Sequence, residues 1–136
     1  MVERVHGALR RLRIAGCLML TGASALAQLP FDLPKTPSQD GASLFVGQCG
    51  TCHTVEHGAP TRQGPNLAGV YMRKAGTLPG FHYSAGFAQA DFVWDDAHLD
   101  AWLGGPQKLI PGAVMLYRQD DPAIRRSIIT WLKDQH

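Results

Sequence analysis

Two cysteines and a histidine stand together in the sequence Cys49-Gly50-Thr51-Cys52-His53. On a helical turn, residues three and four positions apart share one face, so both thiols and the imidazole can point to the same side. Thiols with this spacing can bond to the two vinyl groups of a haem, while the imidazole binds the iron. The pattern predicts one haem c, attached covalently through Cys49 and Cys52 and ligated by His53.

Three other kinds of site also use paired cysteines. A disulfide would suit an exported chain, but it leaves His53 without a role. A thioredoxin-type redox pair is expected beside a βαβ unit, and the sequence has no alternating strand pattern. A structural zinc site needs four ligands, and no second cysteine pair follows Cys52. Haem attachment accounts for all three residues, and we adopt it.

Three helices should surround this site. They are expected at about residues 41–49, 96–103 and 122–134, with Gly104-Gly105-Pro106 ending the second. Aspartates precede all three as N-caps: Asp40, Asp95 or Asp96, and Asp121. Residues 54–92 are irregular and rich in Gly and Pro, so a domain this small buries little surface of its own. We predict an all-α fold with three main helices and long loops, completed by the haem.

Residues 1–27 have the pattern of a secretory signal peptide. A head with four arginines is followed by an apolar run from Ile14 to about Ala25, and Ala25-Leu26-Ala27 suits a signal peptidase. The run is short of the roughly 20 residues that span a bilayer. A lipoprotein signal at Cys17 fits less well, because this cysteine lies near the start of the apolar run and not after it. We expect cleavage after Ala27 and a periplasmic protein with no transmembrane span.

The remaining chain divides into a Pro-rich leader, residues 28–39, and a domain at residues 40–136. Of the chain's 13 Lys and Arg and 11 Asp and Glu residues, four and one lie within residues 1–27. The remainder therefore carries nine cations and ten anions, a formal balance of −1. Because no basic run survives processing, a nucleic-acid partner has no support.

The order of motifs after the cysteines resembles the class I c-type cytochromes, the soluble mitochondrial and bacterial family. The resemblance covers about Gly41 to Lys133, nearly the whole of the domain. It rests on the following segments in their order: Cys49-x-x-Cys52-His53, Gly64-Pro65-Asn66-Leu67, Arg73-Lys74-Ala75-Gly76, Pro79-Gly80-Phe81-x-Tyr83-Ser84, Trp94, and Ile110-Pro111-Gly112 followed by Met115.

The resemblance implies that Met115 is the second iron ligand, because the family places its thioether after a Pro-Gly turn. The other methionine outside the signal, Met72, is interpreted as packing. Four histidines could compete for the iron but are expected at the surface: His57, His82, His98 and His136. Ligation by His53 and Met115 raises the potential and leaves no open position, which favours electron transfer over oxygen chemistry.

The family's supporting residues also have counterparts here. The carbonyl of Pro65 should accept the ring N–H of His53. Arg73, Tyr83 and Trp94 match donors to the haem propionates. In the two outer helices, Gly41 and Phe45 should meet Ile128 and Trp131.

Three positions depart from the family. Trp102 stands where the family usually has a tyrosine near the axial sulfur, and Ala113 and Phe87 stand where a threonine and an asparagine are common. All three changes remove polar groups from the haem pocket.

The resemblance implies a one-electron carrier and no enzymatic activity. Its partners would be redox proteins, such as a dehydrogenase, a quinol-oxidising complex or a terminal oxidase. Gln107 and Val114 occupy positions where the family often has lysine, so we expect weak electrostatic steering toward a partner. The alternatives are a haem enzyme or sensor that releases Met115 to bind a small ligand or peroxide, and a haem-free binding module. The oligomeric state is left open.

Overall fold

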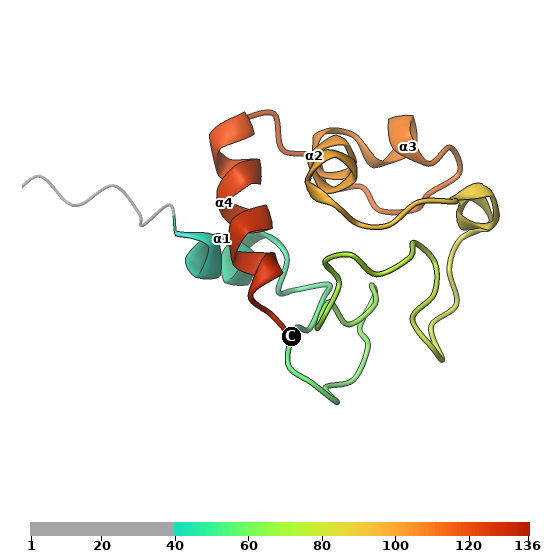
Figure 1. Cartoon of the computed structure of the whole chain (residues 1–136), viewed down its shortest axis with the longest axis horizontal. Helices are drawn as coiled ribbons and strands as arrows, with labels where there is room; N and C mark the ends of the chain where they lie inside the picture. The colour runs from blue at the N-terminus through green and yellow to red at the C-terminus, as the bar shows by residue number, and fades with distance from the viewer. Residues whose placement is uncertain (1–39) are drawn as a thin grey trace, which may run out of the picture. The chain divides into compact units, whose positions relative to one another are not determined.

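The computed structural model of the protein describes residues 40–136. Four α-helices follow one another along this part of the chain, with a short 3-10 helix, η1, at Ala85–Gln89 (Figure 1). The α-helices are α1 at Gly41–Gln48, α2 at Asp96–Gly104, α3 at Pro106–Leu109 and α4 at Pro122–Lys133. Over residues 40–136 the only β pairing is an isolated bridge between Lys74 and Val93. The predicted all-α class is confirmed, whereas the expected signal and leader lie outside the described residues.

Aspartate side chains begin the three longer helices, as the sequence predicts. Asp40 accepts the backbone N–H of Ser43 at 2.9 Å, and Asp95 accepts that of His98 at 2.9 Å. Asp121 accepts the N–H of Ala123 at 2.8 Å, and Pro122 fills the first helical position. Each carboxylate satisfies a donor that the first turn of a helix leaves unpaired.

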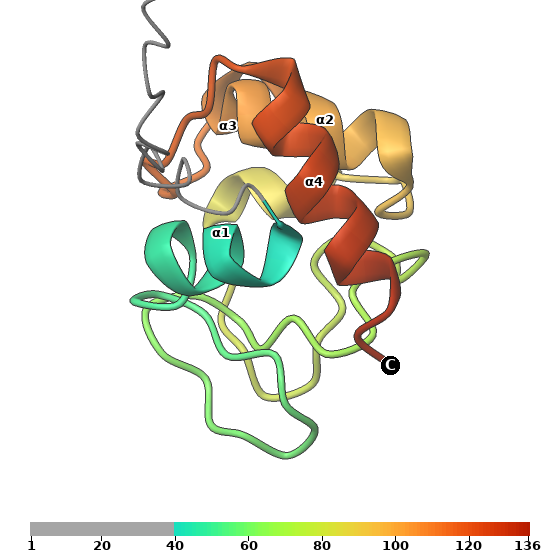
Figure 2. The same cartoon turned by 90° about the vertical axis from the view of Figure 1, so that its left-hand side faces the viewer.

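The outer helices α1 and α4 cross in close contact, and both views of the ribbon show them side by side (Figures 1 and 2). The rings of Phe45 and Trp131 lie 4.7 Å apart, and Ile128 is fully buried. A Cβ on Gly41 would overlap the Cβ of Trp131 and the carbonyl of Ser127. The predicted crossing is confirmed, and glycine is what allows the two backbones to approach.

The helix α3 was not predicted. We took Gly104-Gly105-Pro106 only as the end of α2, but a four-residue helix starts again at Pro106. Proline suits the first position of a helix, since the N–H that it lacks has no intrahelical partner there. The helix α2 packs against both α3 and α4, and its residues Leu99 and Leu103 are buried.

Residues 54–95 contain little regular structure and are organised by buried polar groups. The side-chain amide of Asn66 donates to the carbonyls of Glu56 at 2.8 Å and Ala59 at 3.0 Å. Its oxygen accepts the N–H of Ala68 at 2.7 Å, and Thr54 donates to the carbonyl of Pro60 at 2.8 Å. These bonds satisfy backbone groups that a helix or sheet would otherwise pair.

Across residues 40–136, no helix combines the length and apolarity needed to cross a membrane.

Candidate haem site

The cysteine pair lies on a turn that continues the first helix. The N–H of Cys49 donates to the carbonyl of Phe45 at 2.8 Å, and that of His53 donates to the carbonyl of Cys49 at 3.0 Å. Both cysteines are half-buried free thiols, and burial, with Cys52 nearby, raises the pKa of Cys49 to about 11. Two reduced thiols on one turn are what covalent haem attachment needs.

The imidazole of His53 is held in one tautomer. Its Nδ1 lies 2.8 Å from the carbonyl oxygen of Pro65, which can only accept a hydrogen bond. Nδ1 therefore carries the proton, and Nε2 keeps its lone pair free for a metal. Burial lowers the pKa of His53, which favours this neutral form. The structure thus gives the residue the chemistry of an axial ligand.

A close backbone approach fixes the ring of His53 from one side. A Cβ on Gly64 would overlap three atoms of the imidazole. The N–H of Gly64 donates to the carbonyl of Cys52 at 2.8 Å, which ties this loop to the cysteine turn. Glycine at position 64 therefore sets where the imidazole can lie.

Met115 lies in an extended segment, residues 113–120, whose side chains alternate. Residues with odd numbers are buried or half-buried, and those with even numbers are exposed. Successive side chains of an extended chain point to opposite sides, so Met115 faces the interior with Ala113 and Tyr117. The side chain of Gln107 in α3 donates to the carbonyl of Met115. The segment presents a thioether to the inside of the protein.

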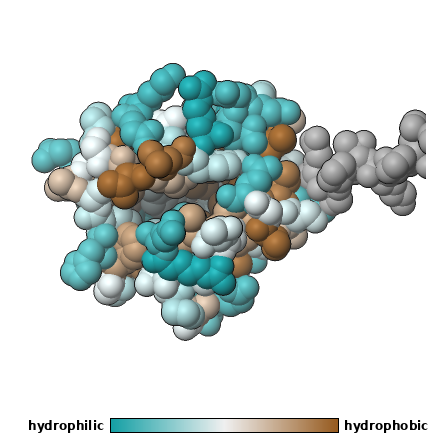
Figure 3. Space-filling model, turned by 180° about the vertical axis from the view of Figure 1, so that it is seen from behind, coloured by the Kyte–Doolittle hydropathy of each residue, from teal (hydrophilic) through white to brown (hydrophobic). Residues whose placement is uncertain are grey.

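An aromatic cluster packs on the same hydrophobic core as Met115. The ring of Trp102 lies 5.6 Å from that of Phe87 and 5.4 Å from that of Trp94, both edge to face. Tyr83 joins the cluster through Phe87 at 4.7 Å. Seen from behind, the molecule is hollowed near the middle of this face, with hydrophobic side chains at the edge of the hollow (Figure 3). The two unusual residues, Trp102 and Phe87, therefore pack together as one apolar surface.

The side chains predicted to donate to the haem propionates lie in this same region. Two of them, Trp94 and Tyr83, have a polar hydrogen that is not donated to any group of the described residues. Trp94 is buried, and none of residues 40–136 accepts its indole N–H in a hydrogen bond. The Tyr83 oxygen accepts the N–H of Leu78 at 3.3 Å, so the phenol proton is still available.

Arg73 and Ser84 show that the polar groups of the region suit an anionic cofactor. The guanidinium of Arg73 bonds to the carbonyls of Ala68 at 3.0 Å and Asn66 at 3.2 Å, and no acid of the described part pairs with it. Burial lowers its pKa, the cost of a cation away from water. The hydroxyl of Ser84 is buried with no hydrogen-bond partner. Carboxylates such as the haem propionates would satisfy both groups, so these residues fit a haem.

Ser84 is a candidate site residue to which our sequence analysis assigned no role. It stands in the matching segment directly after Tyr83, but only the aromatic neighbour was assigned a role. A hydroxyl is common in turns, and its burial cannot be inferred from the sequence.

The rival ligands are engaged elsewhere or exposed. His98 lies 2.7 Å from Asp95 through Nδ1 and stacks on Phe92 at 4.2 Å. The other three histidines are exposed: His57, His82 and His136. In the described residues no group of three His, Cys, Asp or Glu side chains could hold a metal ion.

The interpretation of Met72 as a packing residue is wrong. Its side chain is 56 % exposed, and its backbone has a φ of 61°. This is the left-handed region, which glycine enters without strain and methionine does not.

The η1 helix touches the turn that leads to Met115. A Cβ on Gly86 would overlap the carbonyl of Pro111 and press against Ile110. The loop that carries Ser84 and the segment that carries Met115 are thus in direct backbone contact.

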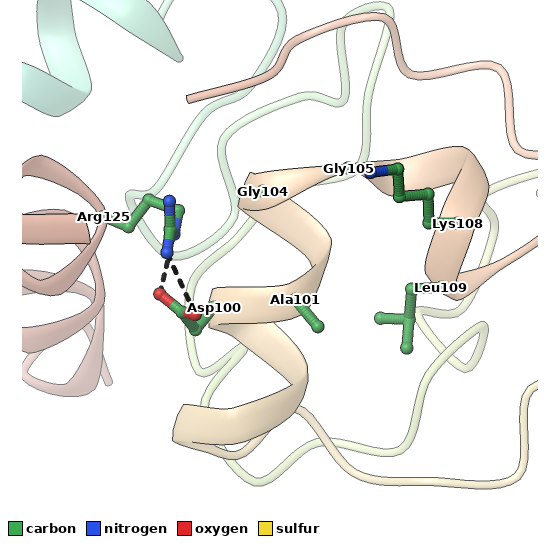
Figure 4. A pocket seen from close by; sticks show the side chains of 7 residues that line it. All are labelled: Asp100, Ala101, Gly104, Gly105, Lys108, Leu109 and Arg125. Carbon is green, nitrogen blue, oxygen red and sulfur yellow. Dashed lines mark hydrogen bonds and ion pairs between the residues drawn. The ribbon is translucent and has the colours of Figure 1, made fainter. Parts of the chain in front are cut away.

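A separate pocket of about 400 Å³ opens between α2, α3 and α4 (Figure 4). Arg125 binds Asp100 across it through two bonds, of 2.7 and 3.2 Å. The pair neutralises its own charge, and none of the predicted haem residues lines this pocket. It therefore has no part in the candidate site.

The sequence is similar to several known proteins over most of its length. It is 38% identical to cytochrome c of Sesamum indicum over 102 residues, covering 74% of this chain and 92% of the relative. It is 38% identical to cytochrome c of Ulva intestinalis over 104 residues, with 76% and 94% covered. It is 34% identical to cytochrome c of Kluyveromyces lactis over 108 residues, with 76% and 96% covered. No family model matches the chain.

Proposed function

Because the chain belongs to the cytochrome c family of electron-carrying haem proteins, we propose that it is an exported carrier of single electrons. In this proposal one haem c is bonded to Cys49 and Cys52, and His53 and Met115 bind its iron. Electrons pass between a redox protein that donates them and another that accepts them, and no substrate is transformed.

The observation that carries this proposal is the bond between His53 and Pro65. At 2.8 Å it fixes the proton on Nδ1 and directs the lone pair of Nε2 away from the carbonyl. Such an arrangement serves a ligand that must stay bound through repeated changes of the iron's charge.

The remaining residues would hold the cofactor and keep water away from it. When bound, the haem supplies the one-electron couple. Arg73, Ser84 and Tyr83 would donate hydrogen bonds to its propionates. Trp102 and Phe87 offer no hydroxyl or amide oxygen to water, so their side of the pocket should be dry. A dry pocket favours the less charged ferrous state.

Export to the periplasm is the second part of the proposal. It is supported by the basic head, the apolar run and Ala25-Leu26-Ala27 at the start of the chain. The test is the mass of the protein recovered from the periplasm of an expressing bacterium with a haem-attachment system. Cleavage after Ala27 should leave Gln28 as the first residue, whereas an intact N-terminus would contradict export by this signal.

The electron-carrier function is tested by a potentiometric titration of the purified protein. We expect haem that survives denaturation, one reversible one-electron step, and a weak ferric band at the red end of the spectrum from the sulfur–iron bond. A high-spin ferric spectrum that changes when peroxide or a small ligand is added would contradict the carrier and favour a haem enzyme or sensor.

A further inference from the structure

The extended segment that carries Met115, residues 113–120, is joined to α1 by side chains. The hydroxyl of Tyr117 donates a hydrogen bond to the side-chain oxygen of Gln48 at 2.5 Å, and the two residues are 69 positions apart. The side-chain amide of Gln119 donates to the same oxygen at 3.2 Å. An amide oxygen has two lone pairs, so both are engaged here. We call Gln48, Tyr117 and Gln119 the clamp.

The clamp is anchored on the two outer helices. Gln48 is the last residue of α1, which packs on α4 and buries Phe45. The turn that follows α1 stays bonded to it, because the N–H of Cys49 donates to the carbonyl of Phe45 at 2.8 Å. The side-chain oxygen of Gln119 accepts the N–H of Asp121, the N-cap of α4, at 3.0 Å. The clamp therefore links the extended segment to the crossing of α1 and α4.

Few other bonds hold the chain that directly follows Met115. In the described part of the protein, residues 116–118 form only one hydrogen bond to another element, and it is the bond from Tyr117 to Gln48. The side chain of Arg118 bonds only within the segment itself. Without the Tyr117 hydroxyl, this stretch would have no polar link to the remainder of the domain. A stretch with so few bonds can open locally at a low free energy.

We propose that the clamp holds Met115 on the iron, with Tyr117 as a positioning residue that acts through the segment. This rests on the proposed function, in which Met115 and His53 are the iron ligands. Gln48 lies just before the cysteine turn that leads to His53, and Tyr117 lies two residues after Met115. The clamp thus joins the two parts of the chain that would supply the ligands. If the segment moves away from α1 and releases Met115, the clamp breaks, so the sixth position stays closed to other ligands.

Binding of free imidazole to the ferric, haem-loaded protein tests this proposal. Imidazole can occupy the sixth position only after Met115 has left it, so its apparent affinity reports how often the segment opens. Tyr117→Phe removes the hydroxyl and keeps the ring. We expect the apparent dissociation constant for imidazole to fall about fivefold, the change that one net hydrogen bond produces. Loss of the sulfur–iron band during the titration measures it.

Tyr71→Phe is the matched control. It also removes one phenol hydroxyl, which donates to Asp96 of α2 at 3.2 Å and has no contact with the clamp. Both variants should lose a similar amount of stability in denaturant unfolding, but Tyr71→Phe should bind imidazole as the unchanged protein does. A purely structural role of Tyr117 would lower the stability and leave the imidazole affinity unchanged.

Two changes of the acceptor check the clamp without altering Tyr117. Gln48→Met removes the acceptor oxygen with little change in size, and it should also tighten imidazole binding at least fivefold. Combined with Tyr117→Phe, it should give much less than the product of the two separate effects, because both variants break the same bond. Gln48→Glu keeps an acceptor oxygen at this position and should bind imidazole no more tightly than the unchanged protein does.

Three results would overturn the clamp. They are an imidazole affinity that Tyr117→Phe leaves unchanged, an equal rise of affinity in Tyr71→Phe, or effects of Tyr117→Phe and Gln48→Met that simply multiply. If the unchanged protein shows no sulfur–iron band, Met115 is not the ligand, and that part of the proposed function fails together with the clamp. A band that is present, with an imidazole affinity indifferent to Tyr117→Phe, removes the clamp alone.

Discussion

The α1–α4 crossing differs from the irregular residues 54–95 and 110–120, which we call the loop side, in what its side chains contact. At the crossing, protein groups meet only other protein groups: Phe45 packs on Trp131, and Ile128 is fully buried. On the loop side, Ser84 is buried without a partner, and Arg73 is a half-buried cation bonded only to carbonyls. The side chains of the crossing fill its interior by themselves. The unpaired polar groups of the loop side instead suit a bound cofactor.

The largest difference between the two regions should appear when both cysteine thiols are removed. In Cys49→Ala with Cys52→Ala, we expect no covalent haem and no cooperative unfolding, because residues 54–95 depend on the cofactor for their core. Haem staining of a denaturing gel and circular dichroism during heating measure the two effects. Thr51→Ala, an exposed change between the cysteines, should alter neither. A stable cooperative fold in the haem-free double variant would show that the loop side is self-sufficient.

The next largest effect should come from Met115→Ala, which tests the loop side while leaving the haem attached. The sixth position of the iron should open, and the redox potential should fall, because the thioether that stabilises ferrous iron is lost. The absorption spectrum and a potentiometric titration measure this. Val114→Ala is the control, since its outward side chain cannot reach the iron. An unchanged spectrum and potential in Met115→Ala would mean that another residue binds there.

The crossing is tested by Gly41→Ala. Its new Cβ would overlap Trp131 and Ser127, so the two helices must separate, at a cost of about 1–3 kcal/mol in the free energy of unfolding. Gly47 lies on the same helix with nothing within 4 Å of its position for a Cβ. Gly47→Ala should instead stabilise the protein by about 0.5–1 kcal/mol. Denaturant unfolding of the haem-loaded proteins gives both values, and equal effects would refute the tight crossing.

The smallest expected effect is a gain in stability from Met72→Gly on the loop side. The left-handed backbone at this position strains a methionine by about 1–2 kcal/mol, and the extra freedom of glycine in the unfolded chain offsets part of the relief. We expect a net gain of about 0.5 kcal/mol in denaturant unfolding. A loss of stability would mean that the exposed methionine makes a contact worth more than its strain.

The sequence predicts the crossing better than it predicts the loop side. An aspartate followed by an apolar helical face is a local signal, which is why Asp40 and Asp121 mark the helix starts correctly. The same local rule failed at Pro106, because proline can end one helix and begin the next. The hydrogen bond between His53 and Pro65 was predicted only because both residues belong to the motifs of the family that the sequence resembles.

The loop side contains structural features that cannot be predicted from the neighbouring residues in the sequence. The positive φ of Met72 and the buried hydroxyl of Ser84 both depend on how distant loops meet. Likewise, Trp102 and Phe87 are separate departures in the sequence, and the structure shows that they contact each other. Pairwise contacts between residues far apart in the chain leave no periodic signal in either one.

The close approach of Gly86 to Pro111 has a consequence for local opening. Two loops whose backbones touch this tightly cannot loosen independently, since a shift in η1 withdraws support from the turn before Met115. They should therefore open as one cooperative unit, at a free energy below that of global unfolding. The amide hydrogens of residues 85–90 and of Ile110, Gly112 and Ala113 should then show one common free energy of opening in hydrogen exchange, and Met115 would lose its place as a haem ligand in the same opening.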